Sequence, residues 1–262
     1  MNATVRGTAA QAGDHPMLET GARLGYAASG LIHLLVAWLA LQIAWGGSSG
    51  SSGSSDQTGA MAQLAKSPVG SALLWVVVAG FILLALWQVA EAVARGDTGS
   101  RVKSAGKAVV YLALAWTGVS VVRGTSSSGA GQTESFTASM MGQPFGRALV
   151  ALIGVGVLAV GVYHVVKGWK AKFLQDLREN PGTWLVRAGR VGYVAKGVAL
   201  GIVGGLFVAA AVTADPDRAA GLDGALRSLQ GLPFGKALLT AVALGLAAYG
   251  VYSFGRARYA RV

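Results

Sequence analysis

Six stretches of this chain contain no charged residue and consist mainly of Ala, Val, Leu, Gly and Ile. They span residues 24–45, 69–90, 108–122, 148–166, 197–214 and 237–255. A bilayer core about 30 Å thick needs roughly 20 apolar residues in a helix. A helical bundle in water would need charged outer faces, which these stretches lack. The sequence therefore predicts six transmembrane helices, the third covering residues 104–122 with Lys107 reaching the interface.

The charge content supports this class of protein. Only 13% of the 262 residues are charged, whereas a soluble domain carries about a quarter. The absence of Cys excludes disulfides, Cys-based metal sites and thiol redox chemistry. The first 23 residues hold no apolar segment of a cleaved signal peptide, so we expect the first span to remain as an anchor.

The distribution of basic residues predicts the orientation. Sixteen of the 22 Lys and Arg residues lie on the side that holds both termini and the second and fourth connections, against six on the other side. Basic residues accumulate in cytoplasmic loops. Both termini are therefore expected in the cytoplasm.

A motif repeats three times at constant spacing. Pro68-Val69-Gly70-Ser71-Ala72-Leu73 recurs with offsets of 76 and then 89 residues. The conserved positions of this Pro-x-Gly-x-Ala-Leu motif are Pro68 and Gly70, Pro144 and Gly146, and Pro233 and Gly235. Each unit contributes two spans and enters the membrane in the same direction, which predicts three parallel hairpins with a pseudo-threefold arrangement. The fold class is thus an all-α polytopic membrane protein.

The repeats set the expected organisation of the chain. A polar cytoplasmic tail (1–22) precedes hairpin repeats at 23–97, 101–173 and 187–258, and a basic connection (174–186) separates the last two. Pro near the first helical turn lacks only an N–H that would have no partner, and the following Gly permits close backbone approach. The stretches before each Pro, at 59–67, 135–143 and 224–232, are expected to form short interfacial helices.

The repeats carry a resemblance to a known family. Arg23-Leu24-Gly25-Tyr26-Ala27-Ala28-Ser29-Gly30 is similar to Arg190-Val191-Gly192-Tyr193-Val194-Ala195-Lys196-Gly197. Together with the triple Pro-x-Gly-x-Ala-Leu motif, this resembles the actinobacterial membrane family catalogued as "domain of unknown function 1206". The resemblance implies a location in a bacterial plasma membrane and no particular activity. The middle copy departs from it, with Lys103-Ser104 in place of Gly-Tyr.

Polar residues within the spans are candidates for a buried site or pathway. His33 lies about 15 Å along the helix from Arg23, near mid-bilayer, and its repeat equivalents are Tyr111 and Leu200. One interpretation is a proton-carrying or ligand-binding group, and the other is an interhelical hydrogen bond that fixes packing. The candidate residues are His33, Tyr111, Tyr163, His164, Gln88 and Tyr252.

No catalytic or metal-binding constellation accompanies them. His164 is expected about 15 Å from His33 in height, which disfavours a shared metal or haem. We therefore expect no metal, no cofactor and no enzymatic activity.

The fourth connection is the most distinctive basic segment. Trp169, Phe173 and Leu177 recur every four residues over 167–177, which predicts an amphipathic helix on the inner leaflet. Its basic residues, Lys167, Lys170, Lys172 and Arg178, would attract anionic lipid headgroups. Nucleic acid is disfavoured because no binding motif is present, and an acidic protein partner remains open.

Two hypotheses for function follow from these features. The first is a structural or accessory membrane bundle that binds membrane lipids, preferably anionic ones, or a larger membrane complex. The alternative is a small-solute or proton pathway along the repeat axis. The small residues Gly197, Gly201 and Gly205 suit helix packing within the chain, or contact between copies of it.

Overall fold

The computed structural model describes the chain except for residues 1–15, 47–54, 95–96, 126–127, 180 and 262. The greater part of the predicted N-terminal tail therefore lies outside the described residues. Every regular element in the described part is helical, apart from an isolated bridge between Leu177 and Ala260.

Six helices are long and apolar enough to cross a membrane, which confirms the prediction of six apolar spans. They are α2 (Pro16–Trp45), α4 (Pro68–Ala94), α5 (Thr98–Val122), α7 (Gly146–Trp169), α8 (Thr183–Thr213) and α10 (Gly235–Tyr259). The shorter elements are α3 (Gln57–Ala65), α6 (Gly129–Met141) and α9 (Gly221–Gln230), with 3-10 turns η2 (Lys172–Asp176) and η3 (Pro216–Arg218).

The elements follow a repeating order of long helix, short helix and long helix. The three short helices α3, α6 and α9 overlap the stretches where short helices were predicted. We call the side where these three lie the short-helix face. The opposite side, where α2 and α8 begin and α7 and α10 end, is the terminus face.

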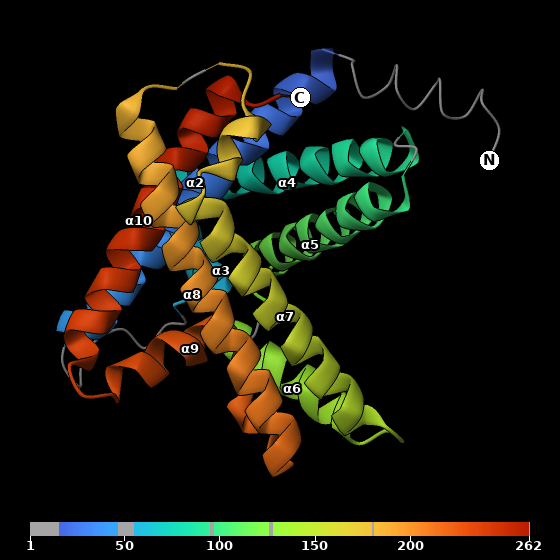
Figure 1. Cartoon of the computed structure of the whole chain (residues 1–262), viewed down its shortest axis with the longest axis vertical. Helices are drawn as coiled ribbons and strands as arrows, with labels where there is room; N and C mark the ends of the chain where they lie inside the picture. The colour runs from blue at the N-terminus through green and yellow to red at the C-terminus, as the bar shows by residue number, and fades with distance from the viewer. Residues whose placement is uncertain (1–15, 47–54, 95–96, 126–127, 180, 262) are drawn as a thin grey trace.

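The long helices pack as three neighbouring pairs (Figure 1). α4 lies beside α5, α7 beside α8, and the last helix α10 beside the first helix α2. Further contacts join α2 to α4 and α8 to α10, whereas α5 and α7 make at most marginal contact over the described residues. The α4–α5 pair consequently splays away from the other two pairs (Figure 1).

Close helix approach depends on glycine at the α7–α8 crossing. A Cβ placed on Gly197 would lie 2.6 Å from the carbonyl oxygen of Gly161, so only a residue without a side chain fits there. The predicted packing role therefore applies to Gly197. The Cβ positions of Gly201 and Gly205 face open space, although the backbone of Gly201 lies against Gly161, and Gly204 makes a further close contact with Gly154.

The repeated motif closes each short helix onto the following long helix. A Cβ on Gly70, Gly146 or Gly235 would collide with a backbone carbonyl near the end of the preceding short helix. The predicted close backbone approach is thus present in all three copies.

The prolines of the motif differ between copies. Pro68 is the first residue of α4, but Pro144 and Pro233 lie two residues ahead of their helices. The intervening Phe145 and Phe234 adopt the left-handed conformation, with φ of 63° and 59°. This conformation is uncommon for bulky residues, and it delays the helix start to the glycine.

The fourth connection is not the amphipathic helix that the sequence predicted. Ala171 adopts a left-handed conformation with φ 49°, which ends α7 and leads into the 3-10 turn η2. Phe173 and Leu177 are buried within the protein, whereas Trp169 is 77% exposed. The apolar spacing in this segment therefore reflects contacts with the bundle's own helices rather than with the membrane surface.

Candidate aromatic and cationic site

The crossing of α8 and α10 brings polar residues together inside the bundle. A Cβ on Gly192 would lie 2.5 Å from Cα of Tyr249, so the two backbones nearly touch at this point. Lys196 follows Gly192 by one helical turn, on the same face of α8. The glycine therefore positions the lysine beside Tyr249.

Lys196 contacts two neutral side chains. Its Nζ lies 4.2 Å from the ring centroid of Tyr249 and 3.4 Å from Nε2 of His33, on α2. Nδ1 of His33 is 2.7 Å from the carbonyl oxygen of Ser29, an arrangement that requires Nδ1 to carry the proton. Nε2 is then free to accept a hydrogen bond from Lys196.

Aromatic rings surround this group. Tyr193 on α8 packs edge-on against Tyr249 at 5.2 Å and stacks on Phe173 at 5.3 Å between centroids. Tyr252, one turn along α10 from Tyr249, lies 5.0 Å from Phe173. Such ring pairs contribute about 0.5–1.5 kcal/mol beyond area burial. The fourth connection thus supplies one wall of the site through Phe173.

A second cation lies nearer the terminus face. The guanidinium carbon of Arg256 is 4.2 Å from the ring centroid of Tyr26, a cation–π geometry. The Nε of Arg256 and the hydroxyl of Tyr252 are both buried without a hydrogen-bond partner in the described part of the chain. Buried polar groups are normally paired, and the Tyr252 hydroxyl has Tyr193 within interaction range.

A third cation is paired with a carboxylate. Nζ of Lys167 lies 2.6 Å from Oδ2 of Asp176 and 5.4 Å from the ring centroid of Tyr193. Among the residues that the structure describes, no ion pair is formed by Lys196 or Arg256. Of these three cations, Lys167 is the one with an ion pair in the described part of the chain.

The structure brings four of the six predicted polar residues to this region. His33 and Tyr252 lie in the site, and Tyr111 stacks on Phe81 at 6.1 Å within electrostatic range of Arg256. His164 stacks against Tyr193 at 5.7 Å, so a series of rings, rather than direct contact, connects it to His33.

The other two predicted residues are Gln88 and Tyr163, and Tyr163 lies near Lys167, whose Nζ is 5.9 Å from its ring centroid. Gln88 is buried on α4, with 2% of its surface exposed. Tyr163 is 53% exposed and contacts His164. It therefore does not line a central pathway as expected.

The polar site does not continue across the bundle. Beyond His33 toward the short-helix face, the buried side chains of α2 and α10 are apolar. They are Val36, Ala37, Leu39, Ala40, Ile43 and Ala44 on α2, and Leu239, Ala243 and Leu246 on α10. The site is thus closed on that side.

The basic residues of the fourth connection do not act as one patch. Lys167 is turned inward to Asp176, whereas Lys170, Lys172 and Arg178 are exposed. The backbone N–H of Arg178 donates to the carbonyl oxygen of Tyr259, 2.8 Å away, which ties the connection to the C-terminal end of α10.

Sequence reasoning missed Lys196, Tyr193, Tyr249 and Arg256 as site residues. Lys196 and Arg256 border the uncharged stretches and were counted only among the basic residues of the terminus side. A usable signal was present in α10, where Tyr249, Tyr252 and Arg256 recur at three- and four-residue spacing on one helical face.

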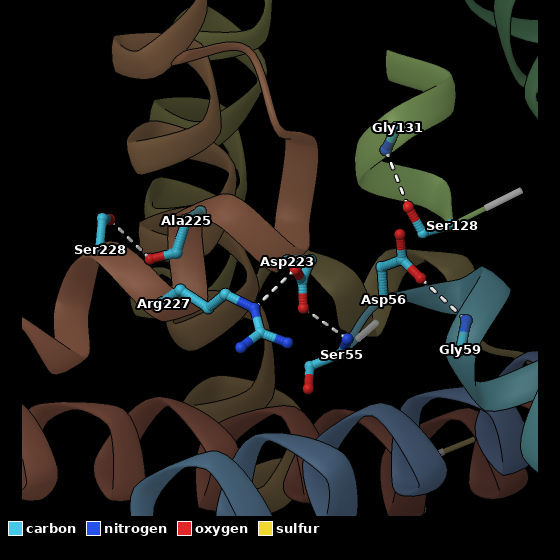
Figure 2. Close-up of polar contacts among 9 residues, drawn as sticks. All are labelled: Ser55, Asp56, Gly59, Ser128, Gly131, Asp223, Ala225, Arg227 and Ser228. Carbon is cyan, nitrogen blue, oxygen red and sulfur yellow. Dashed lines mark hydrogen bonds and ion pairs between the residues drawn. The ribbon is translucent and has the colours of Figure 1, made fainter. Parts of the chain in front are cut away.

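A separate polar cluster joins copies one and three at the short-helix face. The carboxylate of Asp223 on α9 accepts hydrogen bonds from the backbone N–H of Ser55 (2.6 Å) and from Nε of Arg227 (2.8 Å). Figure 2 shows Asp223 between these two partners, with Asp56 nearby at the start of α3. Asp56 caps α3 by accepting from the N–H of Gly59 at 2.9 Å.

The Asp56 carboxyl at this junction is affected by its neighbour Asp223. Burial raises the pKa of the Asp56 carboxyl, and the charge of Asp223 raises it further. The hydrogen bond from Gly59 acts in the opposite direction but does not cancel these effects.

The fold and its surface define a multi-pass helical protein of the membrane type. Large apolar side chains are exposed along every long helix, as lipid contact requires and water does not favour. A family model described as "Domain of Unknown Function (DUF1206)" matches the chain three times, at residues 24–95, 102–171 and 191–260. The chain belongs to this family, and the three matches correspond to the three copies of the repeating unit.

A relative that aligns over nearly the whole chain is itself uncharacterized. The chain is 31% identical over 257 residues to the "Uncharacterized protein YxxB" of Bacillus subtilis (strain 168), covering 93% of this chain and 92% of that protein. No solved structure matches the chain.

Proposed function

We propose that this chain is a non-enzymatic accessory protein of the bacterial plasma membrane that binds anionic lipids and a larger membrane complex. The observation that carries the proposal is the cluster of Lys196 and Arg256 among tyrosines, closed by apolar side chains toward the short-helix face. A site that ends partway through the membrane suits binding. Exposed Lys170 and Lys172 add basic groups at the same end of the bundle.

The orientation is part of the proposal. The excess of Lys and Arg on the terminus side supports placing both termini in the cytoplasm. The cationic cluster then lies at the level of the inner leaflet, where anionic lipids are abundant. No nucleic acid partner is proposed, and contact between copies of the chain is a further possibility for oligomer formation.

The proposed architecture is a pseudo-threefold ring. Gly30 and Gly250 pack closely at the α2–α10 crossing, with a Cβ on Gly30 lying 2.9 Å from the carbonyl oxygen of Gly250. Gly197 and Gly161 occupy the equivalent positions at the α7–α8 crossing. In each case the last helix of one copy meets the first helix of another, as a rotational repeat would require.

The experiment that tests this function is purification from native membranes in mild detergent, followed by native mass spectrometry. We expect retained phosphatidylglycerol or a co-purifying membrane protein. A monomer with neither an anionic lipid nor a partner would refute the proposal.

A pathway for protons or small solutes is the second candidate. The contact between His33 and Lys196 near mid-membrane favours it, because imidazole and amine nitrogens can both carry a proton. The apolar side chains between His33 and the short-helix face oppose it. Flux across proteoliposomes that falls to background in His33→Ala would support the pathway, whereas background flux in the unmodified protein would remove it.

A further inference from the structure

One face of α7 is covered by the protein and the opposite face is not. A Cβ on Gly154 or Gly161 would lie 2.9 or 2.8 Å from a carbonyl oxygen of α8, so these glycines mark the covered face. Only 17% of the apolar α7 segment is buried, against 39% to 50% in α2, α4, α8 and α10. Exposed residues at three- and four-residue spacing form the uncovered face. We call this the α7 outer face, and its residues are Leu149, Leu152, Gly156, Val160 and Tyr163.

The repeat shows what the equivalent face does elsewhere in the chain. Gly156 occupies the position of Gly80 in the first copy and of Gly245 in the third, at the motif offsets of 76 and 89 residues. A Cβ on Gly80 would lie 3.2 Å from Cα of Gly25 on α2, and a Cβ on Gly245 would collide with the side chain of Ala195 on α8. A Cβ on Gly156 would meet nothing within 4 Å among the described residues. The same position therefore packs against a helix in two copies and is uncovered in the middle one.

Lys103 explains why α5 does not cover this face. In the first and third copies the first helix approaches the last through Gly25 and Gly192, where a Cβ would lie 2.7 and 2.5 Å from backbone atoms of the last helix. The middle copy has the exposed Lys103 at this position. A lysine side chain has no room where two backbones nearly touch, so α5 cannot pack on α7 in the same way. The α7 outer face is left for an occupant from outside the chain.

A comparison with Gly205 separates this face from a lipid-facing surface. A Cβ on Gly205 likewise meets nothing within 4 Å in the described part of the chain. The repeat equivalents of Gly205, however, are Trp38 and Trp116, whose side chains are 56% and 71% exposed. That position faces outward in every copy, whereas both equivalents of Gly156 are packed. Gly156 therefore belongs to a helix-packing face and Gly205 to a lipid-facing one.

The α7 outer face continues into a hollow at the short-helix face. This hollow has a volume of about 420 Å³ and lies between the end of α6 and the start of α7, with Leu149 and Leu152 in its lining. Phe145 borders it, 89% exposed and in the left-handed conformation with φ 63°. A projecting ring and a hollow thus lie beside each other at one height in the membrane.

We propose that a second copy of this chain covers the α7 outer face, with α7 packed against α7 about a two-fold axis along the membrane normal. Copies of a membrane protein insert in the same direction, so such an axis brings equal heights together. Gly156 of one copy meets Gly156 of the other, where the absence of side chains allows close helix approach. Phe145 of each copy lies at the height of the hollow in the other. This inference goes beyond the proposed function, which does not depend on a dimer.

Disulfide formation in native membranes tests the contact, because the chain contains no Cys. We expect Gly156→Cys to form a disulfide-linked dimer on oxidation, since the two-fold axis brings this position next to itself, within the Cα separation of about 7 Å that a disulfide needs. Gly205→Cys is the matched control and is expected to remain monomeric. Equal cross-linking of the two variants, or no cross-linking of Gly156→Cys, overturns the proposal.

The dimer dissociation constant in lipid gives an independent measurement. Photobleaching of single fluorescent chains in liposomes, over a range of protein-to-lipid ratios, counts the copies in each complex. We expect Gly156→Leu to raise the dissociation constant about tenfold or more, because two leucine side chains overpack the contact. Gly205→Leu is expected to leave it unchanged, and both variants should fold because each position has open space within one copy. Equal dissociation constants for the two variants, or an unmodified protein that is monomeric at every ratio, overturn the dimer and leave the proposed function standing.

Discussion

The α8–α10 crossing gives a direct test of how this bundle is held together. Gly192→Ala adds one methyl group at a position 2.5 Å from Cα and N of Tyr249, both backbone atoms that cannot rotate aside. Overpacking of this kind costs about 1–3 kcal/mol. For a chain of this size each kcal/mol corresponds to about 2–4 °C in Tm, so we expect a fall of about 2–12 °C.

The same helix offers a matched control. A Cβ on Gly205 would meet nothing within 4 Å, so Gly205→Ala makes the same chemical change without a collision. Replacing a mid-helix glycine by alanine stabilises a helix by roughly 0.5–1 kcal/mol. We therefore expect Tm to rise slightly for Gly205→Ala and to fall for Gly192→Ala, measured by circular dichroism in detergent.

The comparison also reports on the cationic site. Separation of α8 from α10 would move Tyr249 away from Lys196, so Gly192→Ala should weaken phosphatidylglycerol binding along with stability. If the two alanine variants changed Tm in the same direction and by the same amount, the close approach at Gly192 would not stabilise the fold and the reasoning would be refuted.

Two further predictions concern the ends of the helices. The pKa of the Asp56 carboxyl is higher in the folded protein than in the unfolded chain, where it is about 4. The contribution of this carboxyl to the free energy of unfolding is therefore fully present below pH 4 and is lost as the pH rises through the pKa of the folded protein. Asp56→Asn retains a capping side chain and should unfold with a Tm less dependent on pH above 4; an unchanged pH profile would contradict this. For the orientation, Phe234→Cys at the short-helix face should react with a membrane-impermeant maleimide in intact cells, whereas Lys172→Cys should react only after permeabilisation. The reverse pattern would place the termini outside the cell.

Much of the fold was predictable because it follows from the amino-acid composition of the spans and from the spacing of the repeated motif. The uncharged stretches locate the six long helices, and the offsets of 76 and 89 residues between motif copies align Gly70, Gly146 and Gly235, whose close contacts are equivalent in the structure. These features depend on local sequence and on an apolar environment, so they can be predicted without knowing how the helices cross.

The site was harder to predict because it depends on crossings between distant helices. Lys196 looks like a residue outside the helix when α8 is taken to begin with the uncharged stretch, but the helix begins at Thr183, thirteen residues before Lys196. Phe173 and Leu177 have a spacing that suits membrane contact or protein contact equally well. Only the position of α10 decides between them, since Phe173 packs on Tyr252.

The pairing of α10 with α2 has a consequence for the order of assembly. α2 leaves the ribosome long before α10, which is one of its main neighbours, and Nη1 of Arg23 meets the carbonyl oxygen of Arg258 at 2.8 Å only once both helices are inserted. Until then, the face of α2 that will meet α10 is covered by lipid or by an insertion chaperone. A chain truncated before α10 would expose that face permanently, which makes the last helix the one whose loss should mark the protein for degradation.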